Sequence, residues 1–255
     1  MRDPAPIFSA DERERLRDEL VAAAREDAHV VGAAHTGSAA LGHVDRWSDI
    51  DLALAVASGA PMDDVVDAWT RRMYDEHGAV AHHDVWAGTT RFRVFLLANT
   101  LQVDVAFWRE GEFGAIGPTF RLIFGTPANR PSSHAPDPRD LAGMAWLYAL
   151  HVRSSIARGR FWQAEYMLSG MRDHVLALAC VRLGMPAHQG RGMDDLPAQV
   201  TGPMAGALVR SLDAAELTRA FGVATRGLIA ELERVDAAFA RRVAPTLRAL
   251  VAGEG

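Results

Sequence analysis

Residues 49–56 alternate between two kinds of side chain, and this period of two constrains the fold more than any other feature of the chain. The even positions carry Ile50, Leu52, Leu54 and Val56, whereas the odd positions carry Asp49, Asp51, Ala53 and Ala55. Successive residues of a strand point to opposite faces. We therefore expect a strand whose apolar face packs under helices and whose other face presents both carboxylates beside small residues.

A second strand-like segment, residues 101–107, carries a third carboxylate in the same pattern. Leu101, Val103, Val105 and Phe107 form its apolar face, and Gln102, Asp104 and Ala106 alternate with them. If the two strands are neighbours, Asp49, Asp51 and Asp104 converge on one face of one sheet.

Three converging carboxylates repel one another and are costly to desolvate unless a cation is present. Magnesium is the natural partner, because it prefers oxygen ligands and is often shared with substrate phosphates. Two such ions about 3.5–4 Å apart can hold the attacking and leaving oxygens of a displacement at phosphorus. The cluster therefore predicts a magnesium site for phosphate chemistry.

A Gly37-Ser38 turn precedes these carboxylates, between a strand predicted at 29–35 and a short helical stretch at 38–42. Glycine lets the backbone approach a phosphate closely, and N–H groups at the start of a helix favour an anion. The turn therefore predicts a loop that binds phosphates.

Gly37-Ser38, Asp49-Ile50-Asp51 and Asp104 together resemble the nucleotidyltransferase superfamily built on the polymerase-β-like palm. The resemblance extends to members with appended helices, such as the kanamycin, streptomycin and lincosamide nucleotidyltransferases. It implies an enzyme that uses Mg²⁺, with two ions, to move a nucleoside monophosphate from a nucleoside triphosphate to a hydroxyl of a small-molecule acceptor. ATP is the favoured triphosphate. An aminoglycoside or lincosamide antibiotic and a housekeeping small molecule are equally compatible as acceptors, so a role in antibiotic resistance stays open.

The same resemblance assigns a role to each site residue. Gly37 and Ser38 would hold the β- and γ-phosphates, and Asp49 and Asp51 would coordinate magnesium. Asp104 would complete the second metal site and take the proton from the acceptor hydroxyl. Two other functions are compatible with the sequence: adenylylation of a protein, as in antitoxin-like nucleotidyltransferases, and nucleotide binding without turnover.

The order of elements predicts an α+β fold with a nucleotidyltransferase domain at 1–128, a proline-rich linker at 129–138 and a helical bundle at 139–255 that binds the acceptor. In the first domain we expect helices at about 9–27 and 62–77 and strands at 29–35, 49–56, 80–87, 90–98 and 101–108. In the second we expect helices at 139–157, 160–183, 203–211 and 213–251, the last broken near Pro245.

The helix predicted at 160–183 carries the candidate acceptor residue. Glu165 and Arg172 lie on the flank of an apolar stripe, which gives two interpretations. They form a partly buried ion pair, or Glu165 contacts an amine or hydroxyl of the acceptor, as acidic residues of the helical domain do in kanamycin-type enzymes. Trp162 and Tyr166 are expected to pack rather than to stack on a sugar. His82 and Asp84 share a strand face, but an ordinary strand is favoured there over a metal site.

Bulk properties agree with an enzyme for small molecules. The net charge of −5 argues against nucleic-acid binding, and none of the 27 basic residues is a lysine, so arginine alone supplies cationic contacts. The single cysteine, Cys180, is expected in the core. No apolar run approaches the roughly 18 residues of a membrane helix and no signal peptide is evident, so we expect a cytoplasmic protein without membrane contact. The resemblance is compatible with a homodimer, for which the sequence itself gives no interface signal.

Overall fold

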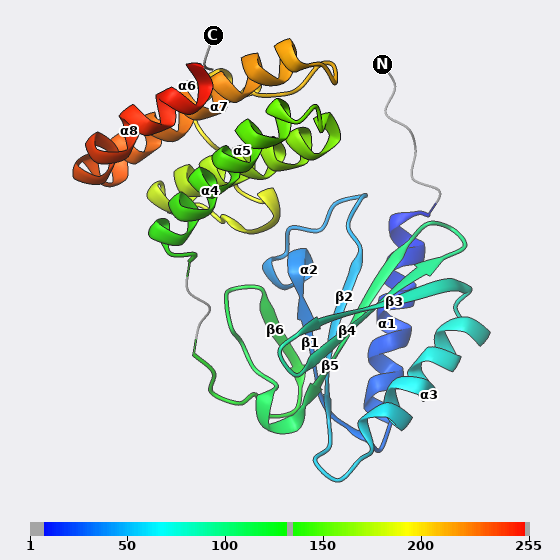
Figure 1. Ribbon diagram of the computed structural model, residues 1–255. Coiled ribbons are helices and arrows are strands. Elements are labelled where there is room, and N and C mark those ends of the chain that lie inside the picture. Colours follow the sequence, from blue (N-terminus) through cyan, green and yellow to red (C-terminus); the bar gives the residue numbers. More distant parts are fainter. Residues whose placement is uncertain (1–7, 132–134, 253–255) are drawn as a thin grey trace. The chain divides into compact units, whose positions relative to one another are not determined.

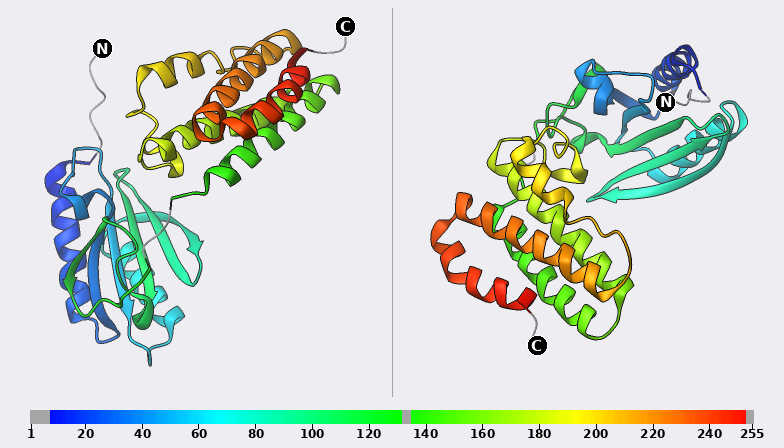
Figure 2. Two further views of the ribbon diagram at one scale, coloured as in Figure 1. Left: turned by 90° about the vertical axis from the view of Figure 1, so that its left-hand side faces the viewer. Right: turned by 90° about the horizontal axis from the view of Figure 1, so that it is seen from above.

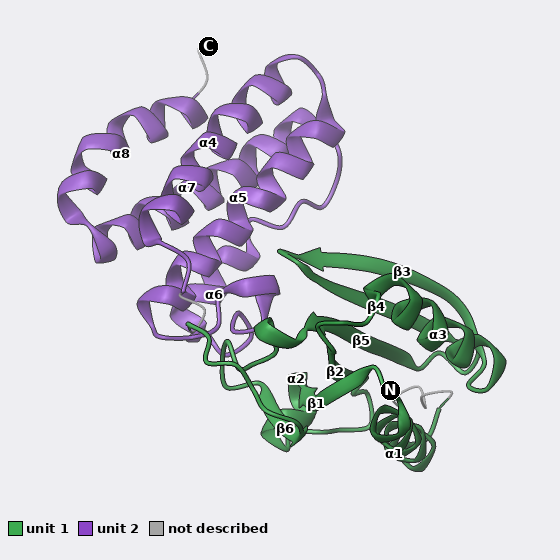
Figure 3. Cartoon of the chain, turned by 90° about the horizontal axis from the view of Figure 1, so that it is seen from below, with its two compact units in different colours: residues 1–133 green, residues 134–255 purple. Residues whose placement is uncertain are grey.

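A computed structural model describes residues 8–131 and 135–252 of the chain. The chain divides into two compact units, residues 1–133 and residues 134–255 (Figure 3). Unit 1 contains a mixed sheet with helices, and unit 2 is helical (Figures 1 and 2). The α+β class predicted from the sequence is therefore confirmed.

Unit 1 follows the predicted order of elements. Its elements are α1 (Ala10–Glu26), β1 (Val30–Thr36), α2 (Gly37–Leu41), β2 (Ile50–Val56), α3 (Met62–Asp75), β3 (Ala79–Ala87), β4 (Thr90–Leu97), β5 (Gln102–Arg109), η1 (Glu110–Glu112) and β6 (Phe120–Phe124). A capping box starts α1: the Ser9 hydroxyl accepts a hydrogen bond from the Glu12 N–H, and the Glu12 carboxylate accepts one from the Ser9 N–H.

The six strands lie in the order β3-β4-β5-β2-β1-β6. β2 and β5 are parallel, and each of the other neighbouring pairs is antiparallel. One face of the sheet packs against α1 and α3, as the alternation in residues 49–56 predicts (Figure 1). Leu52 and Leu54 of β2 lie there with Leu20 of α1 and Trp69 of α3, all of them buried.

The opposite face is built on small side chains. Ala34, Ala53 and Ala106 come from the three adjacent strands β1, β2 and β5 and form a small buried cluster with Phe113 and Trp108. This face carries the polar residues of β2 and β5, because their apolar neighbours in sequence point toward the helices.

The strand β6 is not among the predicted elements. It pairs antiparallel with β1, with Phe120 opposite Thr36 and Phe124 opposite Ala33. Leu122 at its centre is 40% exposed, so β6 shows no buried alternating face that a sequence pattern would reveal. Pairing with a distant segment creates this strand.

Unit 2 consists of α4 (Pro138–Ala157), α5 (Phe161–Arg182), η2 (His188–Gly190), α6 (Ala198–Ala205), α7 (Ala214–Val235) and α8 (Ala237–Ala252). Helix α4 begins inside the segment predicted as a linker, of which residues 132–134 lie outside the described residues. The apolar stripe predicted on α5 is buried at Ala164, Leu168, Met171, Val175 and Leu178, and Cys180 is also buried.

The last helix and α6 differ from the prediction in their boundaries. The last helix breaks at Asp236 rather than near Pro245, because Asp236 ends α7 and its carboxylate accepts a hydrogen bond from the Phe239 N–H, which caps α8. Pro245 lies within α8. Helix α6 starts five residues before the predicted 203 and ends at Ala205 rather than at 211, so Pro203 lies inside it instead of opening it. No helix in residues 8–131 and 135–252 is long and apolar enough to cross a membrane.

Candidate active site

The turn that joins β1 to α2 brings Gly37 against Asp51. Gly37 has a φ of +58°, in the left-handed region that favours glycine. A Cβ on Gly37 would lie 1.9 Å from Oδ2 of Asp51 and 2.7 Å from its Cγ, a distance that no side chain tolerates. The glycine predicted to make room for a phosphate therefore also makes room for a carboxylate of the candidate metal site.

The register of β2 and β5 brings the three carboxylates together. The strands pair in parallel with Asp51 opposite Asp104, and Asp49 directly precedes β2. One carboxylate oxygen from each of Asp49, Asp51 and Asp104 lies within 4.8 Å of the other two, and all three residues are half-buried. Among the described residues this is the one group of acidic, histidine or cysteine side chains arranged so that it could hold a metal ion.

Gln102 contacts two of the three carboxylates. Its Nε2 donates to Oδ1 of Asp104 at 3.0 Å and to Oδ2 of Asp49 at 3.3 Å. Burial raises the pKa of Asp104 to about 6; the hydrogen bond from Gln102 opposes this rise, and the charge of Asp49 adds to it. Without a cation, Asp104 therefore holds its proton to a higher pH than an ordinary aspartate.

The chemistry of the cluster fits magnesium. Mg²⁺ binds oxygens at about 2.0–2.1 Å in octahedral geometry, so its ligands lie about 2.9–4.2 Å apart. Oxygens within 4.8 Å of one another meet this requirement with small rotations of the side chains. A cation would also offset the mutual repulsion that contributes to the raised pKa of Asp104.

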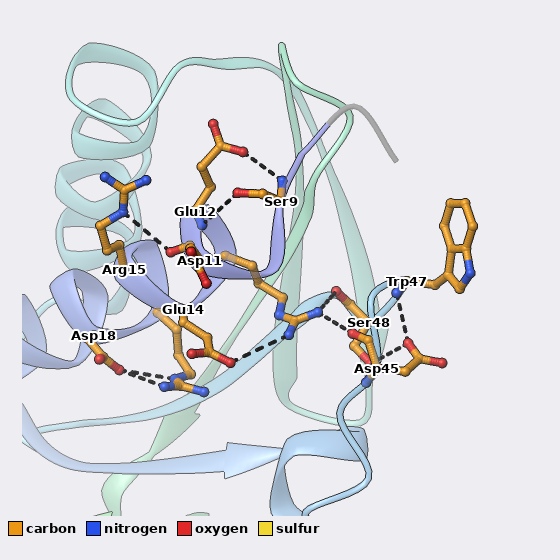
Figure 4. A network of polar contacts seen from close by, with 11 residues as sticks. Ser9, Asp11, Glu12, Glu14, Arg15, Asp18, Asp45, Trp47 and Ser48 are labelled. Carbon is orange, nitrogen blue, oxygen red and sulfur yellow. Dashed lines mark hydrogen bonds and ion pairs between the residues drawn. The ribbon is translucent and has the colours of Figure 1, made fainter. Parts of the chain in front are cut away.

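The loop that leads into Asp49 is held by an arginine that the sequence patterns did not single out. Arg13 of α1 is only 4% exposed, and its guanidinium donates to the backbone carbonyls of Asp45 and, at 3.4 Å, Ser48. The Asp45 carboxylate in turn accepts from the Trp47 N–H and the Ser48 hydroxyl (Figure 4). Arg13 occurs in a run of alternating charges, which reads as a solvated helix face, so the sequence offered no signal for this anchor.

The candidate acceptor residue lies in unit 2. Glu165 is half-buried on α5, as are most residues beside the apolar stripe. Glu165 and Arg172 do not form the ion pair that was one of the two interpretations. Arg172 instead donates to the Ser169 hydroxyl at 2.7 Å and lies 3.8 Å from the Asp173 carboxylate. Arg172 contacts Ser169 and Asp173, three positions and one position away, because these residues lie nearer to it on the helix than Glu165, seven positions away.

The expectation that Trp162 and Tyr166 are packing residues is wrong. Trp162 is 79% exposed and Tyr166 is 67% exposed. These residues are four positions apart and so lie on one face of α5, beside Glu165. Their exposure follows from their place on the helix face opposite Ala164 and Leu168, which are fully buried.

The favoured interpretation of residues 82–84 agrees with the structure. Asp84 forms a bidentate ion pair with Arg93, whose Nε and Nη2 lie 2.6 and 2.7 Å from the two carboxylate oxygens. His82 Nδ1 lies 3.0 Å from the Tyr74 hydroxyl. The arginine holds the pKa of Asp84 below its usual range. This aspartate therefore has its partner within the chain.

No protein-family model matches this chain, and no curated protein matches it in sequence. Among solved structures, it is similar to the crystal structure of an aminoglycoside 6-adenyltransferase from Bacillus subtilis. The TM-score is 0.42 and 10% of the residues are identical, over 95% of this chain and 99% of that one. A likeness at this level concerns the fold alone and not the activity.

Proposed function

We propose that this protein is a magnesium-dependent nucleotidyltransferase that moves a nucleoside monophosphate, preferably AMP, from a nucleoside triphosphate to a hydroxyl of a small-molecule acceptor. The observation that carries the proposal is the convergence of Asp49, Asp51 and Asp104 within 4.8 Å, on the face of the sheet opposite α1 and α3. The close approach of Gly37 to Asp51 supports it, because the turn that we propose to bind phosphates lies directly beside one of these carboxylates.

Each residue has a chemical role in this proposal. Magnesium, when bound, would neutralise the triphosphate and stabilise the charge that develops at the α-phosphorus. Asp49 and Asp51 would hold a magnesium ion, and the backbone at Gly37 and Ser38 would hold the β- and γ-phosphates. Asp104 would contribute to the second metal site and accept the proton of the acceptor hydroxyl, whose oxygen then attacks the α-phosphorus as pyrophosphate leaves.

For the acceptor we propose Glu165 of α5. The exposed rings of Trp162 and Tyr166 support this assignment, because aromatic faces beside a carboxylate are suited to a cationic or sugar-like molecule. Aminoglycoside- and lincosamide-like antibiotics have that chemistry. Glu165→Gln should then raise the acceptor KM while leaving triphosphate binding unchanged.

The binding step can be tested by thermal unfolding with ATP and Mg²⁺. Ligand at about 100 times its dissociation constant adds roughly 2.7 kcal/mol to the free energy of unfolding. At roughly 2–4 °C per kcal/mol, the melting temperature should rise by several degrees. The rise should require both magnesium and triphosphate and should vanish in the double variant Asp49→Ala/Asp51→Ala. An equal rise in excess chelator would show that binding does not use this metal site, and the proposal would be abandoned.

The reaction itself can be tested by pyrophosphate release with kanamycin, streptomycin and lincomycin as acceptors. Release that depends on one of these acceptors supports the proposal. Release that depends instead on a protein acceptor would favour a protein-adenylylating enzyme, and magnesium-dependent binding without any release would favour a nucleotide-binding module.

A further inference from the structure

Gln102 occupies a fixed position at the start of β5. Its neighbours Leu101 and Val103 are 1% and 0% exposed, so both are anchored in the core under the helices. The turn before it is closed by a backbone hydrogen bond from Leu97 to Leu101, and the Asn99 side chain accepts from the Leu101 N–H at 3.1 Å. The backbone of Gln102 is therefore held on both sides, and its side chain lies on the same face as Asp104.

The parallel register places Gln102 beside Asp49, Asp51 and Asp104, and we call these four side chains the quartet. Ile50 pairs with Val103 and Asp51 with Asp104, so Asp49, one residue before Ile50, faces Gln102 across the two strands. The four side chains thus alternate on two adjacent strands, three of them carboxylates and one an amide. Ionised carboxylates only accept hydrogen bonds, so the Gln102 amide is the single member of the quartet that donates.

The amide of Gln102 donates to Asp49 and Asp104, the two carboxylates that lie farthest apart in the sequence. Nε2 lies 3.3 Å from Asp49 Oδ2 and 3.0 Å from Asp104 Oδ1, and so bridges β2 to its partner strand. Each bond offsets part of the repulsion between two acidic groups, and each fixes a carboxylate orientation that would otherwise be free to rotate away from its neighbour.

We propose that Gln102 is a positioning residue that holds Asp49 and Asp104 side by side, ready to receive a divalent cation. This inference rests on the proposed function, because it concerns the same metal site. Residues that orient metal ligands typically contribute about 10–100-fold to metal affinity or activity. Gln102 contributes through the geometry of two ligands rather than through a contact with the substrate.

The test measures metal binding without nucleotide or acceptor. Mn²⁺ serves as the probe, because it accepts oxygen ligands in the same octahedral geometry and its free concentration can be read by electron paramagnetic resonance. Gln102→Met keeps the length of the side chain and removes the donor. It should weaken Mn²⁺ binding by about tenfold or more, while its melting temperature in chelator stays within about 2 °C of the wild type.

Leu96→Ala is the matched control, because Leu96 is the partner of Gln102 on β4, is 49% exposed and has no side-chain hydrogen bond to give. It should bind Mn²⁺ as the wild type does. Equal affinity in Gln102→Met and the wild type, or an equal loss in Leu96→Ala, would overturn the positioning role and leave the metal site intact. A wild type whose Mn²⁺ binding does not depend on Asp51 would overturn the proposed function, and this inference with it.

Discussion

The buried carboxylate of Glu231 in unit 2 and the half-buried cluster of Asp49, Asp51 and Asp104 in unit 1 differ in the groups that lie beside them. In unit 2, Glu231 is 2% exposed and is surrounded by the chain's own cations: Arg182 donates to both of its oxygens at 2.8 and 3.2 Å, and Arg234 donates at 2.6 Å. In unit 1, Asp49, Asp51 and Asp104 gather around one another, and the bridge between Asp49 and Asp104 is a neutral amide.

This difference separates a structural carboxylate from a candidate functional one. A buried charge that is paired within the chain stabilises only if the pair stays intact, and it needs nothing from outside. At Asp104, burial raises the pKa of the carboxyl and the charge of Asp49 adds to the rise. A bound cation would stabilise such a group of carboxylates. Glu231 thus has its cations within the chain, whereas a carboxylate cluster such as the one in unit 1 is suited to a cation from solution.

Glu231→Ala should give the largest change in stability. Removal of one partner from a buried ion pair costs about 3–5 kcal/mol, and we expect the low end because Arg182 and Arg234 keep some contact with water. Urea unfolding should therefore show a loss of about 3 kcal/mol, with Mn²⁺ affinity unchanged.

The control for this variant is an exposed pair. Asp18, which lies 2.9 Å from Arg17 with its side chain 72% exposed, should tolerate replacement by alanine with a change of about 0.5 kcal/mol or less. If Glu231→Ala cost no more than Asp18→Ala, the contrast between the two units would lose its basis.

Asp51→Asn should give the largest change in activity. The amide keeps the size of the side chain but removes the charge that a magnesium ligand supplies. Turnover should fall on the order of 10²-fold or more, since the loss of residues that merely orient metal ligands already costs about 10–100-fold. Near-normal turnover by a folded Asp51→Asn protein would exclude Asp51 from the metal site.

The sequence predicted the site in unit 1 better than it predicted the details of unit 2. Asp49, Asp51 and Asp104 could be placed on one face because a period of two, with large apolar residues on the other face, fixes the direction of every side chain. The pattern did not reveal which strands are neighbours, so the pairing of Asp51 with Asp104 and the bridge from Gln102 required the structure.

Features that depend on contacts between distant segments could not be predicted from the sequence. Nothing local marks β6 as a strand or Arg13 as the anchor of the loop before Asp49. In unit 2, Trp162 and Tyr166 were expected to pack because large aromatic residues are usually buried, but their face of α5 is exposed within the unit. The break at Asp236 was missed because proline is the more familiar helix breaker, whereas a side-chain cap was decisive here.

A pair of glycines sharpens the contrast between the metal site and its scaffold. Gly37 is the first residue of α2 and Gly42 follows its last, with φ values of +58° and +71°. Alanine at either position should therefore cost about 1–2 kcal/mol of stability through backbone strain. Only at Gly37 would the new Cβ collide with Asp51; at Gly42 nothing lies within 4 Å.

The two alanine variants should therefore lose similar stability and differ in metal binding. We expect Mn²⁺ affinity to fall at least about tenfold in Gly37→Ala and to stay unchanged in Gly42→Ala. Parallel titrations followed by paramagnetic resonance would show the difference. Equal affinities would mean that the contact with Asp51 has no part in the metal site.

The smallest effect concerns the pH dependence of stability without metal. The pKa of Asp104 is raised to about 6 in the folded protein, above the ordinary value of 3.8 that applies when the chain is unfolded. Between these values the folded state binds more protons than the unfolded state, so the free energy of unfolding falls as the pH rises through this window and levels off above it. The side chain of Asp104→Asn is neutral at every pH in this range, so its titration does not lower the free energy of unfolding of this variant.

In chelator, the stability of the wild type relative to Asp104→Asn should therefore decline from pH 4 to pH 7. The shift alone sets a ceiling of roughly 3 kcal/mol, which solvent access to Asp104 reduces to about 1 kcal/mol. Because both proteins share their other titrating groups, the difference between their urea unfolding curves isolates this residue.

Excess Mg²⁺ at pH 7.5 should make the wild type more stable than Asp104→Asn, since a bound cation makes the ionised carboxylate favourable. This advantage should fade below pH 6 as protons compete with the metal. A difference that stays constant with pH in chelator would show that Asp104 titrates as an ordinary surface aspartate, and the like-charge cluster would no longer set the site in unit 1 apart from Glu231.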